Sequence, residues 1–173
     1  MSQTITLSIS LVNPGALNAS DLTALLEELG DLTPVLEEVV APALQQQEQE
    51  AFQTQGVSIG SPWADNDPRW VQWKSEHGYS TELLHMTGAL AASIGQSGEI
   101  TSNSALIGTN IPYAEKLQEG FSGRAPDGIF RHVPPRIYMD LTSGDAQDIA
   151  DKVAEFIASR AGIPTEEILV SVS

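Results

Sequence analysis

Histidines and paired acids are the residues of this chain whose types could support chemistry. His77, His85 and His132 lie far apart, and none has the His-x-x-x-His spacing by which a helix presents two zinc ligands. Glu27-Glu28 and Glu37-Glu38 are adjacent carboxylates, but each pair lies beside an apolar helical stripe, which is typical of a solvated helix face. The chain has no cysteine, which excludes a thiolate nucleophile and a disulfide.

Motifs of the common enzyme classes are missing from the sequence. There is neither a Gly-x-Ser-x-Gly elbow nor a phosphate-binding Gly-x-x-x-x-Gly-Lys-Ser/Thr loop. Asp65-Asn66-Asp67 resembles the start of a calcium loop but lacks the glycine and the bidentate glutamate that such a loop needs. We therefore expect no catalytic residue, no metal, no cofactor and no enzyme activity. An enzyme with an unrecognised site is an alternative, which a pocket of converging titratable groups would favour.

The charge of the chain is strongly negative, with 23 acidic and eight basic residues and a net charge of −15. Residues 1–68 contain ten acids and no lysine or arginine, whereas residues 69–136 contain six of each kind. Because such a chain repels phosphate backbones and anionic lipid, we expect neither sequence-specific nucleic acid binding nor membrane binding. No apolar run approaches the roughly 20 residues of a membrane helix, and no signal peptide is visible. The acidic surface either keeps the protein soluble or forms the wall of a DNA conduit.

Hydrophobic periodicity predicts the elements that would position any site. Residues 4–11 alternate polar and apolar side chains, as in a half-buried strand. Two helices are expected to follow, over residues 20–30 and from Thr33-Pro34 to about Phe52, the second with a kink or break at Pro42. A helix is expected over 81–93, followed by a hairpin with strands at Ser93–Gly95 and Ala105–Gly108 around the turn 96–104. The later elements are expected in this order: a short helix from 111 to Gly120, a strand at 137–139, a helix from about Asp145 to Gly162 and a strand at 168–170.

Strands and helices without repeated βαβ units predict an α+β fold. We expect a small, mostly antiparallel sheet packed with two or three helices in a single domain, residues 1–173. Two segments rich in glycine and proline, 56–80 and 121–135, are predicted to be long loops and the main contacts between subunits. The candidate contact residues are Trp63, Trp70, Trp73, Tyr113, Arg124, Arg131 and Arg136. Intramolecular packing is the alternative role for these side chains.

Several sequence blocks together resemble the phage virion-morphogenesis family, also called tail-completion proteins, of the Mu-like and P2-like kind. In chain order they are Gly60-Ser61-Pro62-Trp63, Leu84 to Ile94 with its Thr87-Gly88-Ala89-Leu90 step, Ile107 to Ala114, Gln118-Glu119-Gly120, and Val133 to Thr142. The resemblance covers roughly residues 20–160. The chain departs from the family pattern at Leu117, where the family has His, and at Ile137-Tyr138, where it has Pro-Phe.

The resemblance implies a structural protein of a tailed bacteriophage, located in the virion at the neck or the head-proximal end of the tail and made in the host bacterial cytoplasm. Such proteins form closed rings, so the expected partners are further copies of the chain, as a hexamer, and neighbouring neck and tail-tube proteins, with DNA passing through the ring. Arg136 follows two prolines and presents a rigid guanidinium suited to a carboxylate on the same or a neighbouring subunit. The alternative is an acidic assembly chaperone or DNA mimic that is absent from the finished particle.

Overall fold

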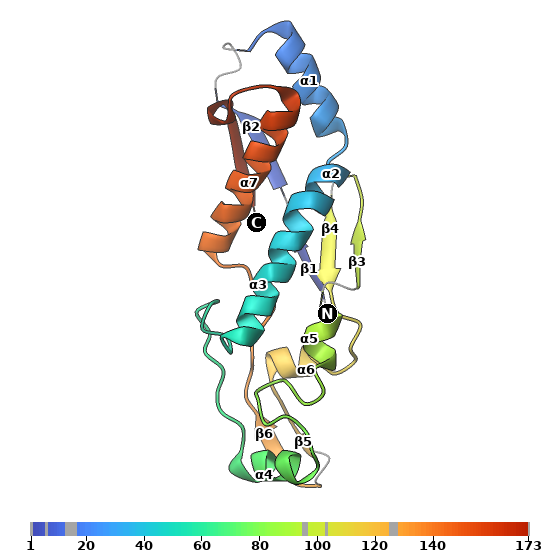
Figure 1. The fold of residues 1–173 in the computed structure, drawn as a ribbon, viewed down its shortest axis with the longest axis vertical. Helices are drawn as coiled ribbons and strands as arrows, with labels where there is room; N and C mark the ends of the chain where they lie inside the picture. Colours follow the sequence, from blue (N-terminus) through green and yellow to red (C-terminus); the bar gives the residue numbers. More distant parts are fainter. Residues whose placement is uncertain are drawn as a thin grey trace. The chain divides into compact units, whose positions relative to one another are not determined.

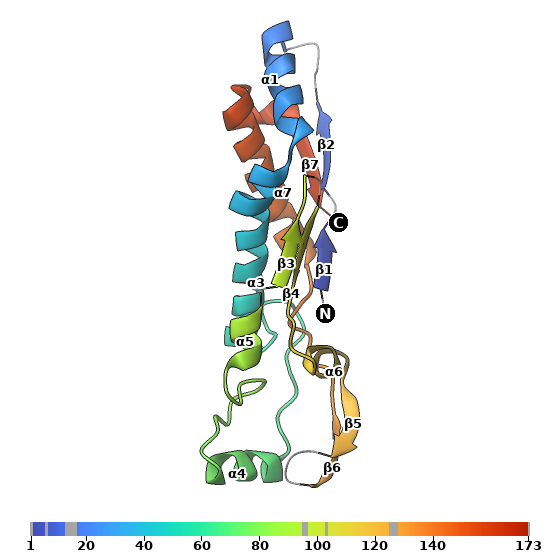
Figure 2. The same ribbon diagram turned by 90° about the vertical axis from the view of Figure 1, so that its right-hand side faces the viewer.

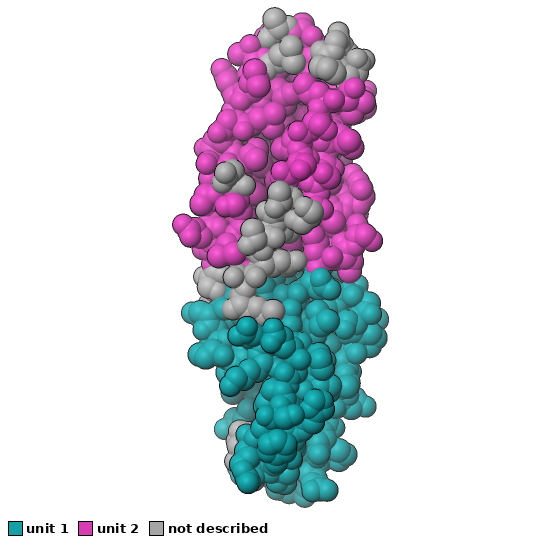
Figure 3. All heavy atoms as spheres, turned by 180° about the vertical axis from the view of Figure 1, so that it is seen from behind, with its two compact units in different colours: residues 1–2, 46–97, 108–140 teal, residues 3–45, 98–107, 141–173 magenta. Residues whose placement is uncertain are grey.

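The computed structural model describes residues 2–5, 7–12, 17–94, 97–102, 104–124 and 128–172. The chain forms two compact units (Figure 3). Unit 1 comprises residues 1–2, 46–97 and 108–140, and unit 2 comprises residues 3–45, 98–107 and 141–173. Helices occur together with small antiparallel sheets (Figure 1), which confirms the α+β fold. A single domain over residues 1–173 stays a prediction.

The first helix of unit 2, α1 (Ala19–Gly30), has a complete capping box at its N-terminus. Asn18 Oδ1 accepts hydrogen bonds from the main-chain N–H groups of Ser20 at 2.9 Å and Asp21 at 3.0 Å. The Asp21 carboxylate accepts one in return from the Asn18 N–H at 3.2 Å. These bonds satisfy donors that the first turn of a helix cannot pair internally, so the predicted helix forms where expected.

The second helical run is continuous from residue 33 to 53 but changes type along its length. It consists of α2 (Thr33–Val35), a π-helical turn, η2 (Leu36–Val40), and α3 (Ala41–Gln53). The Ala41 N–H donates to the Leu36 carbonyl, five residues back. Because Pro42 has no N–H and its ring clashes with an ordinary preceding turn, the wider π turn accommodates it without ending the helix. The predicted break at Pro42 does not occur, and a widened helical turn precedes the proline instead.

The predicted strand over residues 4–11 is two strands in two different sheets. β1 (Ser2–Ile5) pairs with β4 (Ala105–Gly108), which also pairs with β3 (Ser97–Ile100). β2 (Leu7–Leu11) pairs antiparallel with β7 (Ile168–Val172), Leu7 opposite Val172. The predicted hairpin around 96–104 is present, but its first strand begins at Ser97, after the Ser93–Gly95 segment expected for it.

The last helix, α7 (Ser143–Ala161), is capped by Thr142 and Asp145 and ends at Gly162, whose φ of 72° is left-handed. A 3₁₀ turn, η3 (Thr165–Glu167), leads into β7. Figure 2 shows the helices of unit 2 on one side and its strands on the other. The aliphatic core of unit 2 includes Leu25, Leu36, Val40, Leu44, Ile107, Ile149, Val153, Ile157 and Val170.

Unit 1 contains shorter elements. They are α4 (Pro68–Glu76), α5 (Ala89–Ser93), α6 (Ala114–Glu119), β5 (Phe121–Arg124) and β6 (Phe130–Val133), the two strands pairing antiparallel. The long loops predicted at 56–80 and 121–135 are therefore wrong in part, because the first contains α4 and the second the β5–β6 hairpin. Asp67 accepts a hydrogen bond from the Arg69 N–H at 2.8 Å and Pro68 opens the helix, so residues that favour loops also start α4.

The helix predicted over 81–93 is shorter than expected. Leu84 has a φ of 51° and Gly88 a φ of 78°, and left-handed residues interrupt a right-handed helix. Only α5 forms, directly after Gly88.

The strand predicted at 137–139 does not form, because side chains take the place of a neighbouring strand. The Trp63 indole N–H donates to the Ile137 carbonyl at 2.5 Å. The Gln118 amide bonds both main-chain groups of Met139, donating to its carbonyl at 2.8 Å and accepting from its N–H at 3.2 Å. With its backbone groups paired in this way, the segment has no need of a ladder partner.

The core of unit 1 is aromatic. Tyr138 is fully buried, and its hydroxyl donates to the Ala114 carbonyl at 2.9 Å. The Phe52 ring lies 5.4 Å from that of Trp63, edge to face, and 5.2 Å from that of Tyr138. Ile59, Leu83, Leu90, Ile94 and Met139 complete this cluster.

Candidate interaction surface

A pocket of about 450 Å³ opens in unit 1, and blocks of the sequence that are far apart line it together. Its walls come from α4, the segment 84–90, α6, Phe121 and Arg136. Three of the blocks that carry the family resemblance thus meet at one place. The apolar lining side chains are Trp70, Leu84, Met86, Leu90, Leu117 and Phe121.

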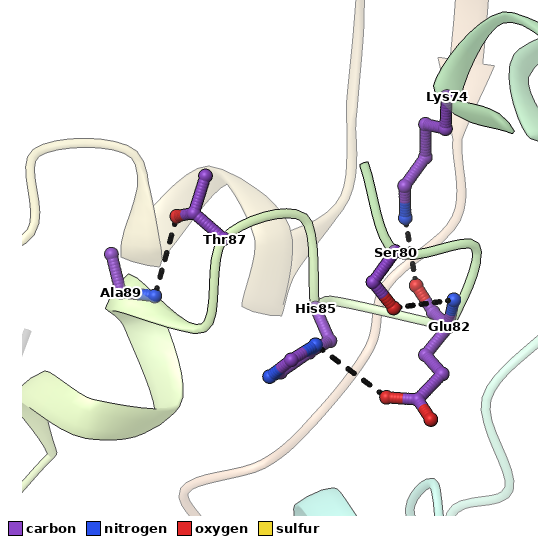
Figure 4. A network of polar contacts seen from close by, with 6 residues as sticks. All are labelled: Lys74, Ser80, Glu82, His85, Thr87 and Ala89. Atoms are coloured by element: carbon purple, nitrogen blue, oxygen red, sulfur yellow. Dashed lines mark hydrogen bonds and ion pairs between the residues drawn. The ribbon is translucent and has the colours of Figure 1, made fainter. Parts of the chain in front are cut away.

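The segment between α4 and α5, which leads into the pocket lining, forms no helix or strand, and polar contacts fix its path (Figure 4). The Lys74 amine donates to the Glu82 carbonyl at 2.9 Å, and the Glu82 N–H donates to Ser80 Oγ at 3.2 Å. His85 Nδ1 lies 3.5 Å from Glu82 Oε2, which makes an ion pair when the ring is protonated. The Lys74 bond ties the segment to α4, and the other two contacts lie within the segment.

The following turn gives the pocket its edge. The Ala89 N–H donates to Thr87 Oγ1 at 3.4 Å, next to the left-handed Gly88 (Figure 4). A Cβ at Gly88 would lie 3.0 Å from His85 Nε2, and the positive φ would strain any residue that carries one. Glycine therefore suits this position for conformation and for space.

Arg136 is 5% exposed and binds main-chain and amide oxygens of its own chain, so the described part of the same subunit does not supply the predicted carboxylate, and one on a neighbouring subunit stays a prediction. Its Nε and Nη2 donate to the Ala64 carbonyl at 3.2 and 3.0 Å, and Nη2 donates to Asn66 Oδ1 at 3.0 Å. The Arg136 N–H donates to the Leu117 carbonyl at 3.1 Å. The guanidinium donates to irregular backbone, whose carbonyls have no hydrogen-bond partner in a helix or sheet. Its acceptors are therefore neutral oxygens.

Positive charge gathers at the pocket. Lys74 is 2% exposed, and burial followed by the charge of Arg136 lowers its pKa, with Glu82 opposing. Burial also lowers the pKa of Arg136, and Asp65 opposes. Among the residues that the structure describes, no carboxylate lies within ion-pair distance of either cation, and the side chain of the exposed Lys116 makes neither a hydrogen bond nor an ion pair. The pocket therefore has an excess of cations within an acidic chain.

A stack of rings runs along α4 beside the pocket. Trp70 and Trp73 lie 4.9 Å apart and nearly parallel, and the His77 ring lies 4.1 Å from that of Trp73. The Arg131 guanidinium lies 5.7 Å from the Trp70 ring centroid, and its Nε lies 3.8 Å from Asp67. Figures 1 and 2 show α4 next to the β5–β6 hairpin that carries Arg131.

The predicted contact residues are divided between the pocket, the core and the surface. Trp70, Tyr113 and Arg136 line the pocket. Trp63 is buried in the core, Trp73 lies within the ring stack, Arg131 is buried over Trp70, and Arg124 is exposed and donates to the Gly128 carbonyl at 2.8 Å. Sequence reasoning did not single out Lys74, Lys116 and Phe121, although Lys116 lies between Tyr113 and Gln118, which do belong to the resemblance.

The pocket has the chemistry of a binding site. It combines apolar walls with the cations Lys74, Lys116 and Arg136, which fits an apolar group that carries a carboxylate. No group of three His, Cys, Asp or Glu able to hold a metal ion occurs within the described ranges. In the same part of the chain, no helix is long and apolar enough to cross a membrane.

One buried acid lies outside the pocket lining. Glu48 on α3 is 2% exposed, and burial raises its pKa to about 7. Neither of its carboxyl oxygens has a hydrogen-bond partner among the described residues. Burial and the nearby Glu48 raise the pKa of Tyr138. A carboxyl group so placed is stable in the core mainly when it is protonated.

Comparison with known proteins confirms the resemblance. The model of the phage virion morphogenesis family matches residues 18–158, a range that contains every residue of the pocket. The chain is 30% identical over 143 residues to the Mu-like prophage FluMu G protein 2 of Haemophilus influenzae, covering 80% of this chain and 91% of that protein. No solved structure matches the chain. The family model and this relative show that the chain belongs to the phage virion morphogenesis family.

Proposed function

We propose that the protein is a structural part of a tailed phage particle that completes the tail or joins it to the head by assembling into a ring at the neck. Membership of the family supports a role in virion assembly. The observation that carries the proposal is the convergence of three family blocks on one open pocket of unit 1. A pocket with apolar walls and cations suits a contact between proteins.

The pocket supports binding rather than catalysis. Its ionisable groups are Lys74, His85, Tyr113, Lys116 and Arg136, and His85, the usual kind of general base, contacts Glu82 and no serine or threonine hydroxyl among the described residues. A general base within hydrogen-bond reach of a nucleophile is what a hydrolytic site needs. We therefore propose that the protein acts by burying surface in an assembly.

The distribution of charge supports contacts between unlike surfaces. Unit 2 contains thirteen acidic and two basic residues, whereas unit 1 contains six of the eight lysines and arginines of the chain. When two different surfaces of one protein are complementary, copies associate head to tail, and the assembly closes into a ring if the rotation permits. Unit 1 also contains ten acids beside its six cations, so a local cation-bearing surface such as the pocket, and not unit 1 as a whole, would meet the acids of unit 2 in the next copy.

The acids of unit 2 also fit the wall of a DNA path. Glu27, Glu37, Glu38, Asp148, Asp151 and Glu155 are exposed. Glu28 is half-buried, and its carboxylate accepts from Arg160 Nε at 3.1 Å, while Glu38 lies 3.9 Å from Arg160 Nη1, so both of these acids are already paired and leave this set. A lumen lined by carboxylates would let a polyanion slide, because it offers no cation to hold phosphates.

The experiment is a phage that carries a nonsense codon in this gene, with and without the wild-type protein supplied from a plasmid. Electron microscopy should show heads and tails that fail to join, or tails of abnormal length, and complementation should restore particles. Mass spectrometry of purified particles should detect the chain at a fixed number of copies. Normal infectious particles without the protein would refute the proposal. Defective assembly with the chain missing from complemented particles would instead establish the assembly chaperone.

A further inference from the structure

We infer that the pocket of unit 1 receives helix α1 of a second copy of this chain, with Leu26 entering the pocket and Glu27 approaching Lys116. The inference rests on the self-assembly proposed above and adds the two surfaces that meet. The pocket side follows from its lining: apolar walls call for an apolar side chain, and three cations without a carboxylate partner among the described residues call for an acid beside it.

Helix α1 offers both groups on its free surface. Leu25 is 2% exposed and belongs to the core of unit 2, whereas the next residue, Leu26, is 70% exposed. Exposed leucines are common singly, but this one is followed directly by the exposed carboxylate of Glu27. A helix that lays an apolar side chain into a groove is an ordinary mode of recognition between proteins.

Other exposed apolar side chains of unit 2 fit the pocket less well. Val12 and Leu169 are also exposed, but Glu167, which lies two residues before Leu169 and whose main-chain carbonyl accepts from the Val12 N–H at 2.9 Å, is half-buried and not exposed. Glu28, the other acid next to this stretch of α1, already pairs with Arg160 of its own unit. The pair Leu26 and Glu27 therefore combines exposure, apolar character and an available carboxylate.

Lys116 is the cation best placed to meet that carboxylate. It is exposed on α6 at the pocket, whereas Lys74 and Arg136 are buried and bonded to neutral oxygens. Burial and, after it, the charge of Arg136 lower the pKa of Lys74, and an acid arriving near the pocket would relieve the repulsion between these two cations.

Disulfide cross-linking tests the contact directly, because the chain has no cysteine of its own. Leu26→Cys and Tyr113→Cys are made in separate proteins, mixed and oxidised. Tyr113 is 46% exposed and lines the pocket. We expect a disulfide between the two variants to form at least about tenfold faster than one between Tyr113→Cys and the control Leu169→Cys, because proximity raises the effective concentration of the thiols. Equal rates for the two pairs would overturn the inference.

Charge exchange provides a second test. Lys116→Glu and Glu27→Lys should each weaken self-association by roughly tenfold, since each replaces an attraction with a repulsion. An equimolar mixture of the two variants should associate more strongly than either alone, because each altered pocket then meets a matching altered helix. Asp148→Lys, on α7, is the matched control and should leave association unchanged. A mixture no stronger than the single variants would contradict the contact.

Light scattering on the wild-type protein separates failure of this inference from failure of the proposed function. If the protein is an oligomer but gives no Leu26–Tyr113 cross-link, the inferred contact is wrong and the proposed ring assembly stands. A protein that stays monomeric at every concentration and within particles overturns both. An acidic amphiphile that copurifies with the chain in native mass spectrometry, and is lost in Lys116→Glu, would show that the pocket takes a small molecule and overturn the inference.

Discussion

Unit 2 buries aliphatic side chains between helices and paired strands, whereas unit 1 closes around aromatic rings whose polar atoms bind irregular backbone. In unit 2 the main chain pairs mostly with itself, so the core needs only apolar residues at the right period. In unit 1, Trp63, Gln118 and Arg136 supply bonds that a neighbouring strand would otherwise make. The difference shows that unit 1 depends on a few polar side chains with specific geometry.

The same difference bears on function. Arg136 donates to the Ala64 carbonyl and also lines the pocket. Lys74 lines the pocket as well, and its bond to the Glu82 carbonyl fixes the segment between α4 and α5. The shape of the pocket therefore depends on the bonds that hold unit 1 together. Unit 2 contributes a regular scaffold with an acidic surface. Changes to the buried side chains that brace unit 1 should affect folding and assembly together, whereas changes to the exposed Leu26 and Glu27 of unit 2 should affect assembly alone.

Truncation of Tyr138 should have the largest effect. Tyr138→Ala removes a fully buried ring and leaves the Ala114 carbonyl without its donor, so it should destabilise the protein by about 3–5 kcal/mol. Hydrogen exchange should show the loss of protection in unit 1, including α6. Ile157→Ala, in the core of unit 2, is the comparison and should lose protection in α7 instead. Identical exchange patterns in the two variants would mean that the two cores do not behave separately.

Glu48 should make stability depend on pH. Its folded pKa of about 7 exceeds the ordinary 4.5, so the folded state binds the proton more tightly, and stability should fall as pH rises from about 4.5 to about 7. The shift corresponds to on the order of 3 kcal/mol. Glu48→Gln should remove this dependence and be the more stable protein at pH 8. Parallel pH profiles for variant and wild type in chemical denaturation would show that Glu48 keeps an ordinary pKa.

Loss of the Arg136 guanidinium should have a smaller effect. Arg136→Ala leaves the Ala64 carbonyl and Asn66 Oδ1 without their donor and should cost about 1.5–3 kcal/mol. Arg136→Lys should recover only part of it, since an amine cannot reproduce the planar fork. Arg124→Ala, at an exposed position, is the control and should be nearly neutral. If thermal unfolding and particle yield are unchanged in Arg136→Ala, the bracing role is wrong.

Removal of the α1 cap should have the smallest effect. Asn18→Ala eliminates the acceptor for the Ser20 and Asp21 N–H groups and should cost about 1 kcal/mol. Because the change is confined to α1, hydrogen exchange should rise in that helix and not in unit 1. Asn18→Asp should preserve most of the stability, since a carboxylate caps as well as an amide. A loss of protection that spreads to α4 or α6 would contradict the independence of the two units.

Regular elements were predictable from the sequence and irregular ones were not. The helices α1 and α7 and the strand β7 follow from apolar spacing with caps and stop residues, and these signals are local. The strand predicted at 137–139 is missing because Gln118 and Trp63 bond its main chain, and these are tertiary contacts. Helix α5 is short because left-handed residues precede it, and hydrophobic periodicity does not encode such conformations. Proline and aspartate at 67–68 were interpreted as loop residues although they also cap α4.

The candidate site was predictable only in part. Tyr113 and Arg136 were singled out from the blocks that resemble the family, and both line the pocket. Lys74 was not, because its role arises from burial beside Arg136 and from its bond to the Glu82 carbonyl. Nor does the sequence reveal that Arg136 binds neutral oxygens. Whether Arg136 meets a carboxylate or a neutral oxygen depends on the path of the segment at Ala64, 72 residues earlier in the chain.

A reconstruction of the phage neck at side-chain resolution tests the central claim most directly. The account predicts a closed ring of this chain in which α1 of each copy occupies the pocket between α4 and α6 of the next, with Leu26 against Trp70 or Tyr113. A neck without this chain, or a ring in which every pocket of unit 1 faces solvent and α1 touches no neighbour, would contradict it.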